Sequence, residues 1–170
     1  MTECTFCELI KRKANVLFEN EKISLMLSPE PATPGHLIIL PKKHATILEQ
    51  VPDYTVKEMF IHANKASTAL FETLGAQGTN ILIQNGEPSG QRHNHVMLHI
   101  IPRFENDKLN LGWQPKKISE DEMSTVELKI KQETGAVGSF EKEKEKPIEI
   151  TKPKEITKED YRVKHLKRIP

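Results

Sequence analysis

Three histidines and a methionine occupy alternate positions in the segment RHNHVMLHII, residues 92–101. The four residues are His93, His95, Met97 and His99. Side chains alternate between the two faces of an extended strand, so these four share one face, and Val96, Leu98 and Ile100 point to the other. Imidazole rings are costly to bury without partners. The spacing therefore predicts a site where the histidines meet a metal ion, a phosphate group or hydrogen-bond acceptors.

The two cysteines of the chain, Cys4 and Cys7, form a C-x-x-C motif. Such a pair can bind a metal or carry out redox chemistry. A redox-active pair is expected at the N-terminus of a helix that follows a strand, and the sequence around Cys4 indicates no such context. We therefore favour a metal site, with two ordinary thiols near the surface as the alternative.

The segments that must position these residues are predicted to be five strands and one long helix. Short apolar runs bounded by polar residues, proline or glycine predict strands over residues 15–18, 23–27, 36–40, 80–83 and 95–101. Apolar residues at three- and four-residue spacing predict an amphipathic helix over residues 55–74, which Gly75 ends. The expected fold class is α+β, an antiparallel sheet with one long helix on it.

The composition changes after Trp113. Residues 119–132 are predicted to form a second helix, with Ser119 and Glu122 as a capping box. Glu, Lys and Pro dominate residues 141–158, and the last ten residues are basic with apolar residues interleaved. We expect a domain over residues 1–113 and, over 114–170, a helix with a charged C-terminal extension. That extension is either solvated and partly disordered or an ordered arm that lies on the domain or on a partner subunit.

The composition of the whole chain argues against several classes of protein. A length of 170 residues fits one domain with an appended tail. The net charge of +1 gives no general attraction to nucleic acid or an anionic membrane, although the basic C-terminus could contact RNA or an acidic partner. No apolar run is long enough to cross a bilayer, and the N-terminus lacks a secretory signal. We expect a cytoplasmic protein.

The order of the motifs resembles that of the histidine-triad (HIT) superfamily. The family signature is a Gly-Gln pair followed by three histidines at alternate positions and often by Pro-Arg. Gly90-Gln91 and Pro102-Arg103 fix the register here, so His95 and His99 match the first and third histidines and Met97 stands at the second. The resemblance also includes TPGH at residues 33–36, PKKH at 41–44 and LGW at 111–113.

The resemblance implies a structural zinc site. Zinc-containing members of the bacterial and archaeal-type branch combine an N-terminal C-x-x-C with the histidine after Pro-Lys-Lys and the first histidine of the triad. Carried over to this chain, the ligands are Cys4, Cys7, His44 and His95. Two thiolates and two imidazoles make a closed tetrahedral site, which is typical of structural rather than catalytic zinc.

The resemblance also implies a nucleotide-binding site. In the family the second histidine attacks the α-phosphorus and forms a nucleotidyl-histidine, a step that the thioether of Met97 cannot perform. Ser28 stands where relatives hold the ribose with an aspartate. The expected nucleotide contacts are Ser28, Gln84, Gly90, Gln91, Arg92, His93, Met97 and His99. His99 would donate to phosphate or, with a shifted ligand, replace the nucleophile.

Three functions remain open at this point. The first is a zinc-stabilised protein that binds a nucleotide or another phosphorylated small molecule with little or no hydrolysis. The second is an active nucleotide hydrolase or transferase of the phosphoramidase or dinucleoside polyphosphate hydrolase type. The third is an interaction module whose C-terminal tail binds protein or RNA. Because relatives commonly pair through the long helix and an adjoining strand, we also expect a homodimer. His36 is expected to be a satisfied structural histidine, and Trp113 a packing residue.

Overall fold

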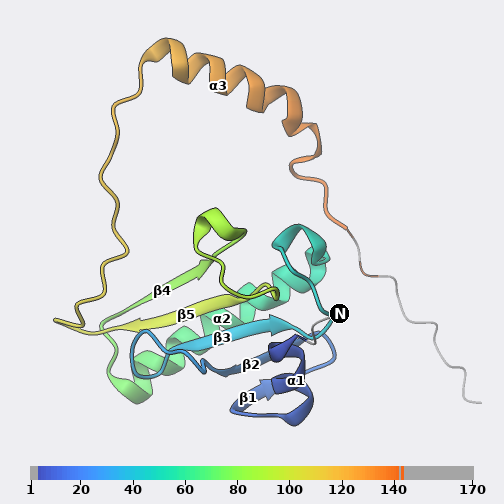
Figure 1. Cartoon of the computed structure of the whole chain (residues 1–170), viewed down its shortest axis with the longest axis vertical. Coiled ribbons are helices and arrows are strands. Elements are labelled where there is room, and N and C mark those ends of the chain that lie inside the picture. The colour runs from blue at the N-terminus through green and yellow to red at the C-terminus, as the bar shows by residue number, and fades with distance from the viewer. Residues whose placement is uncertain (1–3, 142, 144–170) are drawn as a thin grey trace, which may run out of the picture.

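The computed structural model describes residues 4–141 and 143 (Figure 1). Within these residues, five strands form one antiparallel sheet in the order β1-β2-β3-β5-β4. The strands are β1 (Val16–Glu19), β2 (Ile23–Leu27), β3 (Leu37–Pro41), β4 (Gly78–Ile83) and β5 (Leu98–Arg103). The predicted α+β fold with an antiparallel sheet is therefore confirmed.

The long helix α2 (Asp53–Leu74) covers one face of the sheet and passes behind it in Figure 1. It begins two residues before the predicted start and ends where predicted. Gly75 follows with a φ of 64°, the left-handed conformation that glycine adopts most readily. The buried side chains of α2 are Thr55, Met59, Ala63, Ala66, Ser67 and Leu70. They recur at three- and four-residue spacing, which is the amphipathic pattern that the sequence indicated.

A second helix on the sheet, α1 (Thr5–Arg12), was not predicted. It lies on the face opposite α2, in front of the sheet in Figure 1, and buries Phe6 and Ile10. The prediction of one helix on the sheet was therefore incomplete. The eight residues of α1 are too few to form a stable helix alone, so its packing on the sheet must stabilise it. The i, i+4 spacing of Phe6 and Ile10 was the available signal.

The central strand β3 separates two apolar cores. It is buried along its whole length and pairs with β2 on one side and β5 on the other. Leu37 and Ile39 belong to the core under α2, while Ile38 and Leu40 belong to the core under α1. The continuous apolar run of this strand is thus explained by a helix on each face.

The segment before β5 departs from the predicted strand. β5 starts at Leu98 rather than at His95, because residues 92–97 follow an irregular path beside the segment after β3. The backbone N–H of Val96 donates to the Ala45 carbonyl at 2.8 Å. The predicted alternation of faces still holds, since Val96 lies in the core under α2 and Met97 in the core under α1.

The C-terminal helix α3 (Glu120–Glu133) begins with the predicted capping box of Ser119 and Glu122. All the residues of this helix are exposed, and Figure 1 shows it standing apart from the sheet. Trp113 is 86% exposed in the single chain. The prediction that it is a packing residue is therefore wrong. The charged tail, residues 144–170, lies outside the described residues. In the part of the chain that is described, no helix is long and apolar enough to span a membrane.

Candidate functional site

Four of the residues singled out in the sequence, two cysteines and two histidines, converge beside the N-terminus of α1. They are Cys4, Cys7, His44 and His95, and their potential ligand atoms all lie within 4.8 Å of one another. Cys4 is the N-cap of α1 and Cys7 lies in its first turn. His44 follows β3 and His95 precedes β5, so the cluster joins α1 to the two central strands. The structure therefore brings together the set that the resemblance implied.

The cluster fits a tetrahedral zinc ion. Nε2 of His95 donates to the carbonyl of Pro41 at 2.9 Å, which leaves the lone pair on Nδ1. This Nδ1 lies 3.5 Å from both sulfurs, and Nδ1 of His44 lies 3.4 Å from the sulfur of Cys7. Zinc bonded at tetrahedral angles to S and N ligands holds them about 3.5–3.6 Å apart. Burial raises the pKa of the Cys7 thiol and Cys4 raises it further, so metal binding must release protons.

The cysteine pair does lie at a helix N-terminus, contrary to the expectation from the sequence. Cys4 is the N-cap of α1 and Cys7 lies within its first turn, a position that also suits a redox-active pair. The imidazoles of His44 and His95, however, lie 3.4–3.5 Å from the sulfurs. This donor set favours a metal centre.

A cavity of about 310 Å³ lies beside the cysteine–histidine cluster. Seven of the eight predicted nucleotide contacts line it: Ser28, Gln84, Gln91, Arg92, His93, Met97 and His99. The eighth, Gly90, does not line the cavity but lies next to Gln84, which does. A Cβ at Gly90 would come within 2.6 Å of Nε2 of Gln84, and Gly90 has a φ of +93°. A glycine at residue 90 is therefore needed for Gln84 to keep its place in the wall.

The Gln91 side chain is used entirely to shape the loop of residues 86–93. Its amide donates to the carbonyls of Thr46 at 2.7 Å and His93 at 2.8 Å. Its oxygen accepts the backbone N–H of Gly86 at 2.7 Å. Gln91 thus positions the loop, and it is the backbone of that loop which is left to meet a ligand.

The protonation of His99 follows from its contact with His36. The backbone N–H of Ala32 donates to Nδ1 of His36 at 3.0 Å, so the proton of the neutral ring is on Nε2. Burial and the neighbouring His99 lower the pKa of His36 to about 4. Nε2 of His36 lies 3.0 Å from Nδ1 of His99 and donates to it. Burial also lowers the pKa of His99, which favours the neutral ring. Because Nδ1 of this ring accepts from His36, the proton of His99 is on Nε2. His36 is satisfied as expected, and His99 offers a donor.

Two basic residues lie at the rim of the cavity. His93 contacts a carboxylate oxygen of Glu30 at 3.6 Å, and its ring meets the ring of Phe6 edge-on, with centroids 4.9 Å apart. Arg92 is exposed, and no described residue forms an ion pair with its guanidinium group. A phosphate at this rim would find donors with no competing anion on Arg92.

Met97 lies between the cavity and the core under α1. Its side chain is 9% exposed, lines the cavity and packs in the cluster that contains Phe6 and Met26. Across the cavity, the hydroxyl of Ser28 accepts the backbone N–H of Glu30 at 3.3 Å. Neither side chain brings a charge to the cavity.

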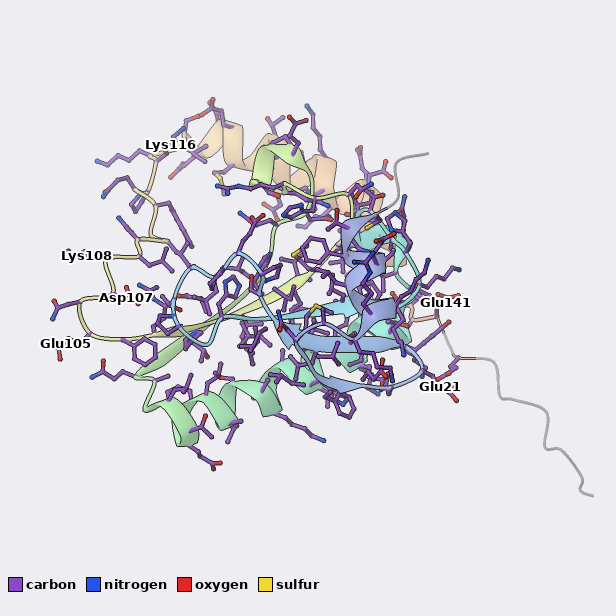
Figure 2. The ribbon with its side chains drawn as sticks, turned by 60° about the horizontal axis from the view of Figure 1, so that its bottom comes forward. Glu21, Glu105, Asp107, Lys108, Lys116 and Glu141 are labelled. Carbon is purple, nitrogen blue, oxygen red and sulfur yellow. The ribbon has the colours of Figure 1, made fainter. Side chains whose placement is uncertain are left out.

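The structure adds cavity residues that sequence reasoning missed, among them Phe6, Leu109 and Leu111. The two leucines belong to the loop after β5, and Asp107 fixes this loop at the strand end remote from α1 (Figure 2). The Asp107 carboxylate accepts from the guanidinium of Arg103 at 2.6 and 2.9 Å and from the backbone N–H of Leu109 at 2.9 Å. The alternation of Leu109 and Leu111 in an extended segment was the available signal.

Comparison with known proteins gives consistent matches. The family model described as HIT domain matches residues 11–106. An uncharacterised HIT-like protein of Methanocaldococcus jannaschii is 38% identical over 106 residues, which cover 61% of this chain and 81% of that protein. An adenosine 5'-monophosphoramidase of Candida albicans is 29% identical over 141 residues, covering 79% and 93%. The structure of a zinc-bound histidine triad family protein from Mycobacterium smegmatis superposes with a TM-score of 0.59 at 30% identity, covering 79% of this chain and 97% of that one.

Proposed function

Because this chain belongs to the HIT domain family, we propose that it binds a nucleotide, or another phosphorylated small molecule, with little or no hydrolysis. One observation carries the proposal. The cavity combines donors suited to phosphate with a buried thioether, Met97, at the position where the resemblance expects the nucleophile. In this proposal the protein binds the same class of ligand as its family but lacks the nucleophile for the first chemical step.

The lining of the cavity suits the two halves of a nucleotide. Arg92, His93 and His99 supply donors for phosphate oxygens, while Leu109 and Leu111 supply apolar surface for a base. A volume of about 310 Å³ lies at the small end of the range for ligand sites. A mononucleotide is therefore the expected size of ligand.

The histidine that remains favours binding over turnover. A nucleophilic imidazole needs a free lone pair, and Nδ1 of His99 already accepts from His36. Its other nitrogen carries the proton, so His99 can donate to a phosphate but cannot attack one in this tautomer. This argues against the second function, in which His99 replaces the nucleophile.

The cysteine–histidine cluster would hold a structural zinc ion, with Cys4, Cys7, His44 and His95 as ligands. The bound ion would cross-link α1 to the central strands and so add to the stability of the fold. Metal analysis of protein purified without added metal should give about one zinc per chain, and Cys4→Ser should lose it. A fully folded protein free of metal would contradict the assignment. Free thiols as zinc ligands also fit a reducing compartment, and the proposed location is the cytoplasm.

The nucleotide proposal is tested by calorimetric titration with AMP beside a turnover assay on the same sample. We expect AMP to bind and no AMP to be released from adenosine phosphoramidate. His99→Ala should weaken binding, whereas Lys57→Ala, an exchange on α2 outside the cavity lining, should not. AMP release that His99→Ala abolishes would support the active enzyme instead.

The exposed apolar side chains of the C-terminal helix α3 support a second candidate function, that of an interaction surface. Its apolar side chains are exposed, among them Met123, Val126, Leu128 and Ile130. Residues 1–113 would then be the HIT domain, and residues 114–170 an extension that contacts a protein, RNA or the second subunit of a homodimer. If AMP does not bind and a pulldown depends on residues 119–170, this role replaces the first.

A further inference from the structure

We propose that Phe6 couples the cysteine–histidine cluster to the cavity, so that metal occupancy sets the affinity of the cavity for its ligand. The inference rests on the proposed function for the identity of that ligand. It assigns to Phe6 a positioning role, and it assigns to the metal a function beyond the stability of the fold. Three sets of contacts support it.

The first support is the position of Phe6 between the two cysteines. Cys4, Phe6 and Cys7 occupy the N-cap and first turn of α1, so a metal held by both sulfurs fixes the backbone that carries the Phe6 ring. The ring itself is 4% exposed and packs against the sheet beside Met97. A change in the geometry of this turn must therefore move the ring or the residues that it touches.

The second support is the contact between Phe6 and the cavity wall. The Phe6 ring lines the cavity and meets the His93 ring at 68° with centroids 4.9 Å apart. Within the described residues, the His93 ring also lies 3.6 Å from the exposed carboxylate of Glu30, and the His93 carbonyl accepts from the Gln91 amide at 2.8 Å. Phe6 is thus the buried neighbour of the His93 ring, and Glu30 is its exposed one.

The third support is a residue that belongs to both sites. His95 presents Nδ1 to both sulfurs and also lines the cavity. It lies two residues after His93 and two before Met97, in the irregular segment that precedes β5. Metal removal would release both the segment that carries His93 and His95 and the first turn of α1. The contact between His93 and Phe6 in the cavity wall would then lose its support from both sides.

The coupling must be reciprocal, because both ligands bind the same folded state. If chelation weakens AMP binding by some factor, AMP must strengthen zinc binding by that same factor. Typical couplings between sites change affinity about 5- to 150-fold. We expect a value near the lower limit, about 5- to 20-fold, since one ring contact and one shared residue connect the sites.

The first experiment follows the histidine rings by NMR in full-length protein with labelled histidine. Removal of zinc by a chelator should shift the His93 ring signals, and Phe6→Leu should remove most of that shift while the protein still binds about one zinc. The chain offers a matched internal control. Phe18 and His62 form another ring pair, with centroids 4.8 Å apart, and neither lines the cavity nor belongs to the cluster. The His62 signals should not move. Unchanged His93 signals on zinc removal would overturn the proposal.

The second experiment measures AMP affinity with and without zinc, and zinc affinity with and without AMP. Equal factors in the two directions, lost in Phe6→Leu, are expected. Ile10→Val controls for a general weakening of α1, because Ile10 packs in the same core and does not line the cavity. Equal AMP affinity in the two metal states would overturn the coupling. If His93 responds to zinc but AMP binds in neither state, the nucleotide proposal fails and the coupling stands.

Discussion

Met97 lies where the cavity meets the core under α1. Its exchange for histidine tests whether the rest of the cavity can still support the family's nucleophilic step. Met97→His should give measurable release of AMP from adenosine phosphoramidate, because it returns an imidazole to the position that the resemblance assigns to the nucleophile. The new ring must find a partner among apolar neighbours, so the variant should also lose about 1–3 kcal/mol of stability. Met97→Leu should stay inactive and retain the fold. A folded Met97→His protein that binds AMP but does not release it would show that other parts of the site have diverged.

The pair of His36 and His99 predicts a loss of stability in weak acid. The pKa of His36 in the folded protein is about 4, below the ordinary value of 6.5, so protonation favours the unfolded chain. The stability that depends on the neutral ring is complete above pH 6.5 and falls as the pH drops toward 4. Between pH 7.5 and 4.5, we expect the protein to lose about 2 kcal/mol more than His36→Gln, which cannot titrate. Urea unfolding of both proteins at both pH values measures this difference. Equal losses would show that His36 is not held neutral by the fold.

Motifs and the family resemblance were sufficient to name the four residues of the cysteine–histidine cluster and seven residues of the cavity lining, but not Phe6, Leu109 or Leu111. Cys4, Cys7, His44 and His95 were assigned through motifs, and the fold brings them together. The tautomers could not be predicted in the same way. That of His95 depends on the carbonyl of Pro41, 54 residues away, and that of His99 depends on a chain that begins at the backbone of Ala32. Such contacts exist only after the backbone has folded.

At the scale of elements, the sequence predicted long or strongly apolar segments and missed those that packing creates. β2, β3 and α2 have patterns that their own residues determine. By contrast, α1 is short and becomes a helix because Phe6 and Ile10 are buried against the sheet. The irregular course of residues 92–97 likewise depends on the Gln91 side chain and on the Ala45 carbonyl. Most of these contacts join residues far apart in the sequence, so local propensity cannot predict them.

The loop after β5 provides a test at this scale. Asp107 contacts Arg103 and the backbone N–H groups of Phe104 and Leu109, and these bonds hold the pKa of its carboxyl well below the ordinary range. Asp107→Asn should lower the stability at pH 7 and weaken AMP binding several-fold, because the bonds of Asp107 hold the loop that carries Leu109 and Leu111. Thermal unfolding and calorimetry measure the two effects.

Glu105→Gln is the matched control for Asp107→Asn, since Glu105 is exposed on the same loop (Figure 2). It also removes one negative charge, yet the hydrogen bond of Glu105 to Gln77 uses the backbone N–H and survives. Both stability and affinity should stay close to those of the natural protein. If Asp107→Asn behaves like this control, the loop is held by other contacts.

At the scale of the whole molecule, the two sites share one part of the fold. The cysteine–histidine cluster joins α1 to the central strands, and the cavity lies between that junction and the loop after β5. Two small cores, one on each face of β3, stabilise this arrangement. Among the described residues, the lining of the cavity ends with the loop that carries Leu109 and Leu111, close to the proposed domain boundary at Trp113, where the composition changes.

This boundary predicts that a chain of residues 1–118 folds and works without the rest. All side chains of α3 are exposed, and the contacts of the described part of the extension with the domain include surface bonds of the Glu141 N–H to Asp53 and of Glu143 to Lys22, at 2.7 and 2.6 Å. Exposed pairs of this kind contribute at most about 1 kcal/mol each. The shortened chain should therefore keep its zinc, bind AMP within about twofold of the full chain and change little in unfolding free energy.

The same truncation decides what the exposed apolar side chains of α3 are for. If α3 contributes to a homodimer, sedimentation should show a dimer for residues 1–170 and a monomer for residues 1–118. Val126→Glu in the full chain, which keeps the length and adds a charge to the apolar face, should then dissociate it as well. If both chains have the same mass in solution, α3 does not contribute to self-association, and its exposed face favours a different protein or RNA as partner. If instead the shortened chain loses zinc or AMP binding, the domain extends beyond residue 118 and the proposed boundary is wrong.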